Sequence, residues 1–511
     1  MKWLLENKLI LLLAVIKFLL PFIIVDAVWE LHRDEYLYYQ QGQHLDLGYL
    51  ENPPLIGLLG YISSLLGGSE FWIKFWSALF GAINLLVACA IAKELGGKLF
   101  GQFIAALGIL FSAYMRIHYL FQPNFLEIFF WTLSAYYLFR FINTNENRYL
   151  YLLCIALSLG WWSKYSVLFF IASLVIALLL TRHRKLLTQR HFWFSVLLGV
   201  ALVLPNILWQ YQHNFPLAHH MEELRETQLQ YVDKGNFIKD QLIMLLPVAF
   251  VWIGGLAWLL LHNKYRIVAY MFLGVIILLM LGSGKSYYSL GAYPMIIAAG
   301  GVWLEKISLK QVWIRYAAVI VILTLSIPAI PVLLPKQAPA AMATFNKKYD
   351  IGGMGLLRWE DQQDHPLQQD YADMLGWKEL TVKAENFFNT LPDSVKADVV
   401  IYCRNYGQAG AVKYYSKERY FADKVICDNG TFLLWIPGRL EFSHLLFIGR
   451  NMPEKGDEVF DHFEKATIVD SVNNPLSRQH GDKVIFFQNA DAKAAKLARE
   501  GLKEMKMKFN R

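Results

Sequence analysis

The sequence predicts a polytopic α-helical membrane protein with about eleven transmembrane helices, followed by a small C-terminal α/β domain outside the membrane. Of the 511 residues, 56% are hydrophobic and only 18% are charged, which excludes an ordinary soluble protein. Up to about residue 335 the chain is a series of apolar runs, mostly close to the roughly 20 residues that cross a bilayer. From residue 336 to residue 511 its composition is that of a water-soluble protein.

Basic residues predict the orientation of these spans. Lys8, Lys93, Lys98 and the basic loop 182–190 lie at alternate ends of successive runs, so the positive-inside rule places them in the cytoplasm. The first run has no small-residue cleavage site and is expected to be a retained helix. An odd number of spans then puts the N-terminus inside and residues 336–511 outside a cell inner (plasma) membrane. The expected spans are 9–25, 72–92, 103–114, 125–139, 149–162, 167–180, 192–209, 242–261, 267–281, 293–304 and 314–334.

The remaining segments are expected to form loops and an outer domain. Residues 26–54 form the first outer loop, 55–66 an interfacial helix too short to span, and 210–240 a long polar loop. In the outer domain, alternating and turn-bounded patterns predict strands, helices and a turn at Asp428-Asn429-Gly430. The predicted strands are 397–403, the two flanking that turn within 423–436, 443–449 and 483–488, with helices at 405–415 and 492–508.

Charge and cysteine content narrow the possible partners. The net charge of +8 is explained by the basic cytoplasmic loops, so nucleic-acid binding is not predicted. Cys89 and Cys154 lie in apolar runs and are interpreted as small hydrophobic residues. Cys403 and Cys427 could pair in an oxidising compartment, but sequence does not fix the geometry that a disulfide needs. No cofactor is predicted, and the spacing of His118, His213, His219 and His220 matches no metal site.

The first outer loop carries the densest charge near a span. Asp34 and Glu35 follow His32 and Arg33, and tyrosines surround them. Three more basic residues, Arg116, Lys164 and Lys285, lie near span ends on the same side, where the positive-inside rule predicts few. A polar loop with snorkelling cations would explain each residue separately. Their grouping with two carboxylates indicates an anionic ligand at the outer surface.

One reaction uses this combination of residues. An enzyme that takes a sugar from a polyprenyl phosphate needs cations or hydrogen-bond donors aimed at the leaving phosphate. It needs a carboxylate to accept a proton from the acceptor hydroxyl, which is a poor nucleophile. The lipid of such a donor would also explain the many spans. Many transporters would carry the same residues, so the combination alone is a weak signal.

The order of the motifs is more specific. HRDEYLYY, GYLENPPL, FQPNFLEIFFW, GWWSKYSVLFF, PNILWQYQHNFP and KSYYSLGAYP succeed one another along the chain. Together they resemble the bacterial branch of the GT-C glycosyltransferases that is similar to dolichyl-phosphate-mannose protein mannosyltransferases and the lipid A aminoarabinose transferase. The resemblance covers most of the chain and extends to QDYADMLGW (369–377) and NYGQAGA (405–411) in the outer domain.

The resemblance implies roles for the outer-face residues. Asp34 matches the acidic catalytic base of the first outer loop. Glu35 would position the acceptor or Arg33, although a local salt bridge would explain it almost as well. Lys164 and Lys285, with Tyr288, match the contacts to the phosphate side of the donor, for which lysine is suited as a point charge. Arg33 is a further candidate for that phosphate.

The fourth-span motif departs from the family pattern. Relatives often have an aspartate where this chain has Glu127, and elsewhere in the wider family an aspartate stands near Asn124. The departure puts a metal in doubt, and a divalent metal is possible but not indicated. Glu127, Asn124 and Tyr38 are therefore predicted to orient substrate, and a buried carboxyl without catalytic duty would explain Glu127 equally well. Pro53 and Pro54 shape their loop and have no predicted chemical role.

The sequence thus favours an inverting membrane glycosyltransferase that moves a hexose or pentose from a polyprenyl phosphate to a protein, lipid or glycan hydroxyl on the outer face. A transporter or lipid flippase for an anionic substrate is the alternative, and predicts facing charges in mid-span, where Lys17 is the main case. A scaffold acting through its outer domain is a third. The sequence does not identify the sugar, the acceptor, the lipid length or the oligomeric state.

Overall fold

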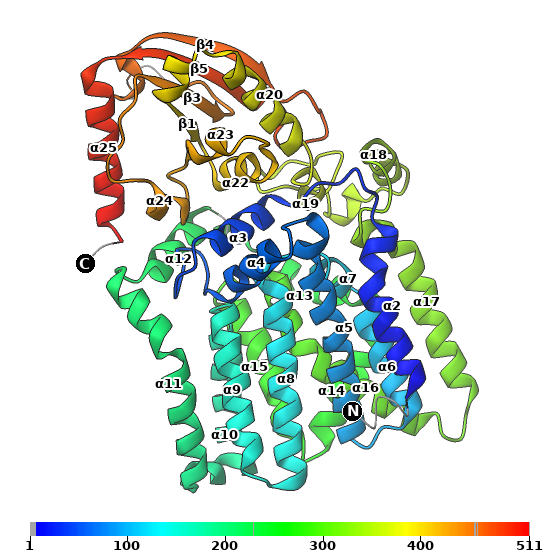
Figure 1. The fold of residues 1–511 in the computed structure, drawn as a ribbon. Coiled ribbons are helices and arrows are strands. Elements are labelled where there is room, and N and C mark those ends of the chain that lie inside the picture. Colours follow the sequence, from blue (N-terminus) through cyan, green and yellow to red (C-terminus); the bar gives the residue numbers. More distant parts are fainter. Residues whose placement is uncertain (1–6, 228, 454–455, 457, 510–511) are drawn as a thin grey trace.

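The computed structural model describes residues 7–227, 229–453, 456 and 458–509. A helical bundle carries an α/β domain at one end, and α3 (Arg33–Gln43) lies between the two (Figure 1). Helices occupy all the apolar runs predicted to span. They are α2 (Lys8–Ile24), α5 (Glu70–Glu94), α6 (Leu99–Leu110), α8 (Pro123–Thr144), α9 (Arg148–Ser163), α10 (Val167–Leu180), α11 (Arg190–Gln212), α14 (Ala249–Leu261), α15 (Arg266–Leu281), α16 (Tyr293–Ile307) and α17 (Trp313–Leu333).

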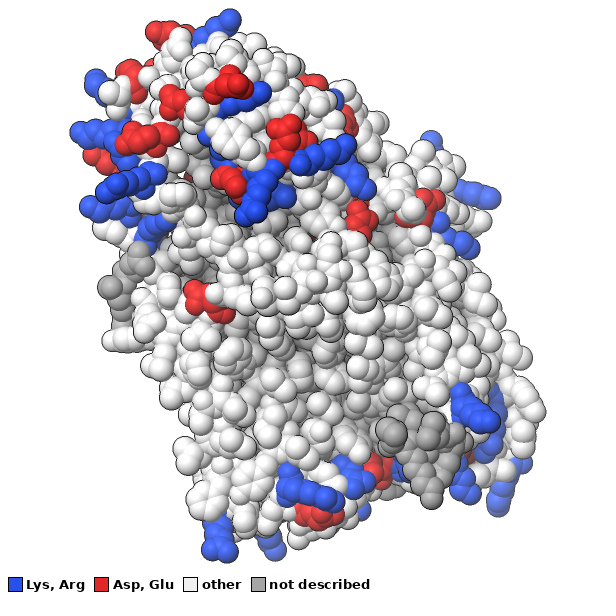
Figure 2. Space-filling model, viewed as in Figure 1, with Lys and Arg blue, Asp and Glu red and all other residues white. Residues whose placement is uncertain are grey.

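Few of these helices would each cross a membrane unaided. Among the described residues, four helices, α5, α8, α11 and α17, are long and apolar enough, or up to six if each of two bent pairs is one span. The number eleven is therefore not confirmed and stays a prediction. Figure 2 shows charged side chains gathered at both ends of the visible face, with a broad zone between them that is almost free of charge.

Close helix contacts in the bundle depend on glycine. A Cβ atom on Gly300 of α16 would lie 2.0 Å from the carbonyl oxygen of Val251 in α14. One on Gly301 would lie 2.2 Å from the carbonyl oxygen of Gly101 in α6. No larger residue fits at these positions, so α16 packs backbone to backbone against two neighbours. Such small-residue contacts are typical of helices that associate within a bilayer.

Short helices and 3-10 turns connect the longer helices of the bundle. The predicted interfacial helix is α4 (Leu55–Leu65), which packs against α3. The prediction of a long polar loop at 210–240 was wrong, because much of that segment is helical. Helices that expose one side to solvent carry many polar residues, so the polar composition of this segment did not distinguish helices from a loop. The connecting elements are α7 (Tyr114–Ile117), α12 (Pro216–Thr227), α13 (Lys234–Met244), η1 (Arg182–Thr188), η2 (Leu229–Tyr231), η3 (Leu246–Val248) and η4 (Ser286–Ala292).

The outer domain is built on a five-stranded mixed sheet in the order β2-β1-β3-β5-β4. Strand β1 (Val399–Cys403) pairs in parallel with β2 (Val425–Ile426) and β3 (His444–Gly449). Strand β5 (Lys483–Ala490) pairs antiparallel with β3 and β4 (Phe463–Ser471). Helices α20 (Trp377–Thr390) and α22 (Tyr406–Tyr415) pack together beside it. The other helices are α18 (Pro339–Lys348), α19 (Gln369–Ala372), α21 (Asp393–Ala397), α23 (Arg419–Asp423), α24 (Phe432–Trp435) and α25 (Ala492–Met507), with η5 (Gly352–Met354) and η6 (Phe460–His462).

The sequence patterns anticipated part of this sheet. Strands β1, β3 and β5 and helices α22 and α25 lie where they were predicted. The predicted strand pair around Asp428-Asn429-Gly430 was wrong, because β2 is followed by helix α24 and not by a second strand. Strand β4 and helix α20 were missed. Cys403 and Cys427 are both buried as free thiols.

The outer domain docks onto the first outer loop through tight packing and two half-buried acids. A Cβ atom on Gly410 of α22 would lie only 2.7 Å from the Cβ of Tyr36, so α22 and α3 are in close contact. Glu30 accepts hydrogen bonds from the backbone nitrogens of Trp377 and Lys378, where the positive end of the α20 dipole favours a carboxylate. Farther along, Glu51 accepts a 2.6 Å bond from the backbone nitrogen of Thr431. The loop and the outer domain therefore form one surface.

Candidate active site

The N-terminus of α3 is held by a reciprocal cap. His32 is the N-cap residue, and its Nδ1 accepts a 3.1 Å hydrogen bond from the backbone nitrogen of Asp34. Glu35 returns the interaction by accepting a 2.7 Å bond from the backbone nitrogen of His32. Such a capping box satisfies backbone donors that the first helical turn leaves without partners. It sets the direction in which Asp34, between the two residues, projects.

Glu35 is the most enclosed acid of the group. Its side chain has no exposed surface and forms a 2.5 Å ion pair with Lys74 of α5. Its other oxygen accepts a 2.5 Å bond from the backbone nitrogen of Phe121, just before α8. All the hydrogen bonds and the ion pair of the Glu35 carboxylate are thus with other residues of the protein. This geometry favours the local salt bridge that the sequence left open, and a positioning role for Glu35.

Asp34 is more accessible. Its side chain is 23% exposed, and Oδ1 accepts a 2.8 Å hydrogen bond from the hydroxyl of Tyr406 and a 3.3 Å bond from Nε of Arg33. Burial alone would raise the pKa of Asp34. The charges of Arg33 and His32 and the hydrogen bonds of Tyr406 and Arg33 outweigh it and lower the pKa to about 2. Asp34 is therefore ionised at neutral pH and reachable from solvent.

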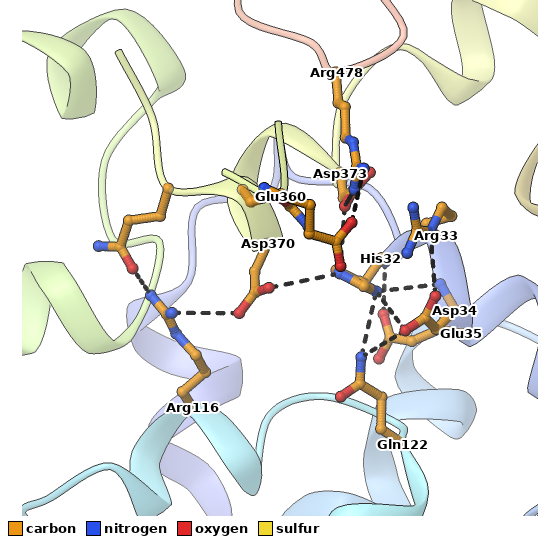
Figure 3. A network of polar contacts seen from close by, with 12 residues as sticks. His32, Arg33, Asp34, Glu35, Arg116, Gln122, Glu360, Asp370, Asp373 and Arg478 are labelled. Carbon is orange, nitrogen blue, oxygen red and sulfur yellow. Dashed lines mark hydrogen bonds and ion pairs between the residues drawn. The ribbon is translucent and has the colours of Figure 1, made fainter. Parts of the chain in front are cut away.

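Acids of the outer domain surround the other edge of His32 (Figure 3). Its Nε2 lies 4.0 Å from Asp370 and 3.9 Å from Asp373. Asp373 pairs at 2.8 Å with Arg478, and Asp370 pairs at 3.3 Å with Arg116 of the bundle. The chain near Asp34 is thus enclosed by charges from both parts of the protein.

A second polar cluster lies where α8 and α9 meet. Nζ of Lys164 donates hydrogen bonds of 2.7 Å to Asn124 and 3.0 Å to Glu127. The ammonium group also lies 4.0 Å from the ring centre of Tyr288, over its face. Glu127 is buried and additionally accepts a bond from the hydroxyl of Ser166. One exposed edge of a lysine, fixed by a carboxylate and an aromatic ring, suits an anion.

Gln122 joins the two clusters. Its Nε2 donates a 3.3 Å hydrogen bond to Asp34, and its Oε1 accepts a 3.2 Å bond from Asn124. Because Asn124 also accepts the bond from Lys164, polar contacts run without a break from the acid to the lysine. The site therefore places an ionised carboxylate and a fixed cation along one line of side chains.

The structure brings most of the predicted residues to this line. Burial, followed by the negative charge of Asp34, raises the pKa of Tyr38 well above its usual value. Lys285 precedes η4, which carries Tyr288, and its side chain makes no hydrogen bond or ion pair with another described residue. Arg33, which was grouped with the lysines, instead extends toward Tyr406, because it is the first residue of α3 and faces α22.

Several contacts were missed from the sequence. Gln122 stands in a motif that was recognised, but its amide carries no charge to attract notice. Lys74 was absorbed into an apolar run, although a lysine inside the predicted span 72–92 was a usable signal. Tyr406 and Asp373 lie more than 300 residues beyond Asp34, and no local pattern links them. Within the described residues, no three His, Cys, Asp or Glu side chains gather closely enough to hold a metal ion.

Comparisons with known proteins confirm the resemblance that the motifs suggest. Residues 51–209 match the family model described as dolichyl-phosphate-mannose-protein mannosyltransferase. The lipid A galacturonosyltransferase RgtD of Rhizobium johnstonii is 26% identical over 193 residues, which are 37% of this chain and 41% of that protein. The matched family segment contains Asn124, Glu127 and Lys164 and begins after Asp34.

The similarity of fold extends over nearly the whole chain. ArnT from Cupriavidus metallidurans, solved with bound undecaprenyl phosphate, gives a TM-score of 0.64 at 12% identity and covers 95% of this chain and 98% of its own. The oligosaccharyltransferase of Archaeoglobus fulgidus gives 0.52 at 12% identity, covering 86% of this chain and 67% of its own. The predicted GT-C fold, with a helical bundle and a small sheet domain, is therefore confirmed.

Lys74→Met tests the buried ion pair. The substitution leaves the carboxylate of Glu35 without its cation in a fully buried position, so we expect a loss of about 3–5 kcal/mol in the free energy of unfolding. Unfolding of the purified protein in detergent measures it. The double variant Glu35→Gln/Lys74→Met serves as control and should recover much of the loss, because no buried charge remains. Equal stability of wild type and Lys74→Met would show that the pair does not hold the site.

Proposed function

Because the chain has the GT-C fold, we propose that it is a membrane glycosyltransferase that moves a sugar from a polyprenyl phosphate to an acceptor hydroxyl outside the membrane. The observation that carries the proposal is the line of contacts from Asp34 through Gln122 and Asn124 to Lys164. An acid for the acceptor and a cation for the leaving group lie at its two ends. Neither a scaffold nor a transporter calls for that arrangement.

In the proposed reaction, Asp34 takes the proton of the acceptor hydroxyl. Direct attack of that oxygen on the anomeric carbon breaks the bond to the lipid phosphate and inverts the configuration. A carboxylate with a pKa of about 2 is a weak base toward a free alcohol. It suffices late in the step, because an oxygen already bonded to the anomeric carbon is a far stronger acid than an alcohol. The low pKa also keeps Asp34 ionised before the acceptor arrives.

The leaving phosphate would lie by Lys164, Lys285 and Tyr288. Lys164 is fixed by Asn124 and Glu127, so it needs little reorganisation as negative charge develops. Glu127 and Asn124 then act by orienting Lys164, and Tyr38, one turn after Asp34 on α3, would orient the substrate. Arg33 keeps Asp34 ionised in this scheme and does not contact the donor phosphate. No step of the proposed reaction uses a metal.

Asp34→Asn tests the base. We expect transfer to fall by about 10²–10⁴-fold, because an amide cannot accept the proton, while binding of the donor lipid is unchanged. Release of lipid phosphate from a radiolabelled polyprenyl-phosphate sugar, measured with acceptor present, reports the rate. Asp46→Asn, an exposed acid of the same loop, is the matched control. Full transfer by Asp34→Asn would remove the base assignment.

Lys285→Met tests the phosphate contact. The side chain makes no hydrogen bond or ion pair within the described part of the chain, so its loss should disturb no partner. We expect the KM for the donor to rise by about tenfold at low salt and the effect to shrink at high salt, since ions screen exposed charges. Lys310→Met, on the loop between α16 and α17 at the other end of the bundle, is the control (Figure 1). A donor KM equal to that of the wild type at low salt would contradict this role.

A further inference from the structure

A cavity of about 210 Å³ lies between the first outer loop and the outer domain, and the proposed transfer reaction gives it no role. Four arginines line it, Arg33, Arg404, Arg450 and Arg478, together with Asp482. They come from four separate segments of the chain. The lining therefore combines distant parts of the sequence and is strongly basic.

The topology of the sheet explains why the arginines meet. Arg404 directly follows β1, and Arg450 directly follows β3. After β1 the chain forms β2 on one side of β1 and then β3 on the other side. The order in which the parallel strands are added therefore reverses between β1 and β3. In open α/β sheets, ligands bind outside the carboxyl ends of the strands at such a switch point. The cavity occupies that position.

The charges are only partly balanced within the lining. Asp482 lies 3.4 Å from Nε of Arg450 and accepts a bond from Gln408. Arg478 pairs with Asp373 and Glu360, whose charges also act on Arg33. Arg33 uses only Nε, toward Asp34, and its two terminal nitrogens donate no hydrogen bond to another described residue. Arg404 donates a 3.4 Å hydrogen bond to the hydroxyl of Tyr402. The unused guanidinium edge of Arg33 matches the two oxygens of a carboxylate or phosphate.

We propose that this cavity binds a carboxylate or phosphate group carried by the acceptor, which makes the acceptor an acidic molecule. The inference rests on the proposed function, because it takes Asp34 as the reacting centre. Arg33 lines the cavity and also bonds Asp34 at 3.3 Å, so an anion held there presents a neighbouring hydroxyl to the base. This anion site is separate from the proposed site of the donor phosphate. That phosphate would lie by Lys164 at the end of α9 and by η4, both in the helical bundle.

The anion site is tested first without any donor. Inorganic phosphate is the probe, added to the full-length protein in detergent, and the unfolding temperature is measured. Phosphate should raise this temperature in the wild type and in Arg419→Gln, an exposed arginine of the same domain that pairs with Asp423. The rise should be lost in Arg404→Gln and Arg450→Gln. No rise in the wild type, or an equal rise in all four proteins, overturns the site.

Arg450 also donates to the carbonyl oxygens of Arg478 and His480, so its replacement alone could disturb a loop. Arg404→Gln is therefore the decisive variant, provided that its unfolding temperature without phosphate equals that of the wild type. Arg404→Lys, which keeps the charge, should retain part of the response. A complete loss in Arg404→Lys together with a lowered unfolding temperature would indicate a structural role and count against the proposal.

The source of the anion is tested in the transfer assay, with an extract of the cell envelope as acceptor. Arg404→Gln should raise the KM for the extract by about tenfold, with kcat and acceptor-free hydrolysis of the donor unchanged. If the anion is a phosphate, pretreating the extract with phosphatase should lower transfer. If it is a carboxylate, capping with carbodiimide and a neutral amine should lower transfer instead. If neither treatment lowers it, the acidic acceptor is excluded. If the wild type releases no lipid phosphate from any donor, the transferase proposal fails, whatever the phosphate measurement gives.

Discussion

The buried carboxylate of Glu35 is the interaction on which the rest of the site depends. It accepts from the backbone of His32, from Lys74 and from the backbone of Phe121, and so joins α3, α5 and the segment before α8. An unpaired charge in that position would be very costly, which leaves little freedom in the distances. Asp34 is its immediate neighbour in the chain. The distance of Asp34 from Gln122, the residue after Phe121, is fixed by the same contacts.

The outer domain completes what the bundle begins. Of the partners that hold Asp34, Tyr406 comes from α22, and the acids facing His32 come from the segment before α20. The same domain is anchored to the first outer loop by Glu30 and Glu51. Loosening the domain would therefore withdraw a hydrogen bond from the carboxylate of Asp34. The position of the outer domain therefore affects the hydrogen bonding of Asp34.

Sequence predicted those features that depend on neighbours in the chain. Apolar runs located the bundle helices and the buried strands β3 and β5, whereas β1 alternates between buried and half-buried residues. The prediction for the segment after Asp428 failed because a turn signal does not determine whether the next element is a strand or a helix. The contact between Arg33 and Tyr406 was not predicted, because Tyr406 lies in another domain and no local pattern links the two residues. The helix cap by His32 could have been predicted from Glu35 three residues later, whereas the contacts of Lys74 and Asp373 arise only from tertiary packing.

In the proposed reaction, the outer domain keeps Asp34 ionised so that it can act as the base. The pH dependence of transfer in Tyr406→Phe, compared with Tyr414→Phe on the same helix, tests it most directly, since the hydroxyl of Tyr414 bonds to Gly68 and not to Asp34. Losing a bond that favours the carboxylate raises its pKa, so activity should disappear at a higher pH on the acid side, within about pH 3 to 6. Tyr414→Phe should keep the wild-type profile. Identical acid limbs in all three proteins would contradict the account.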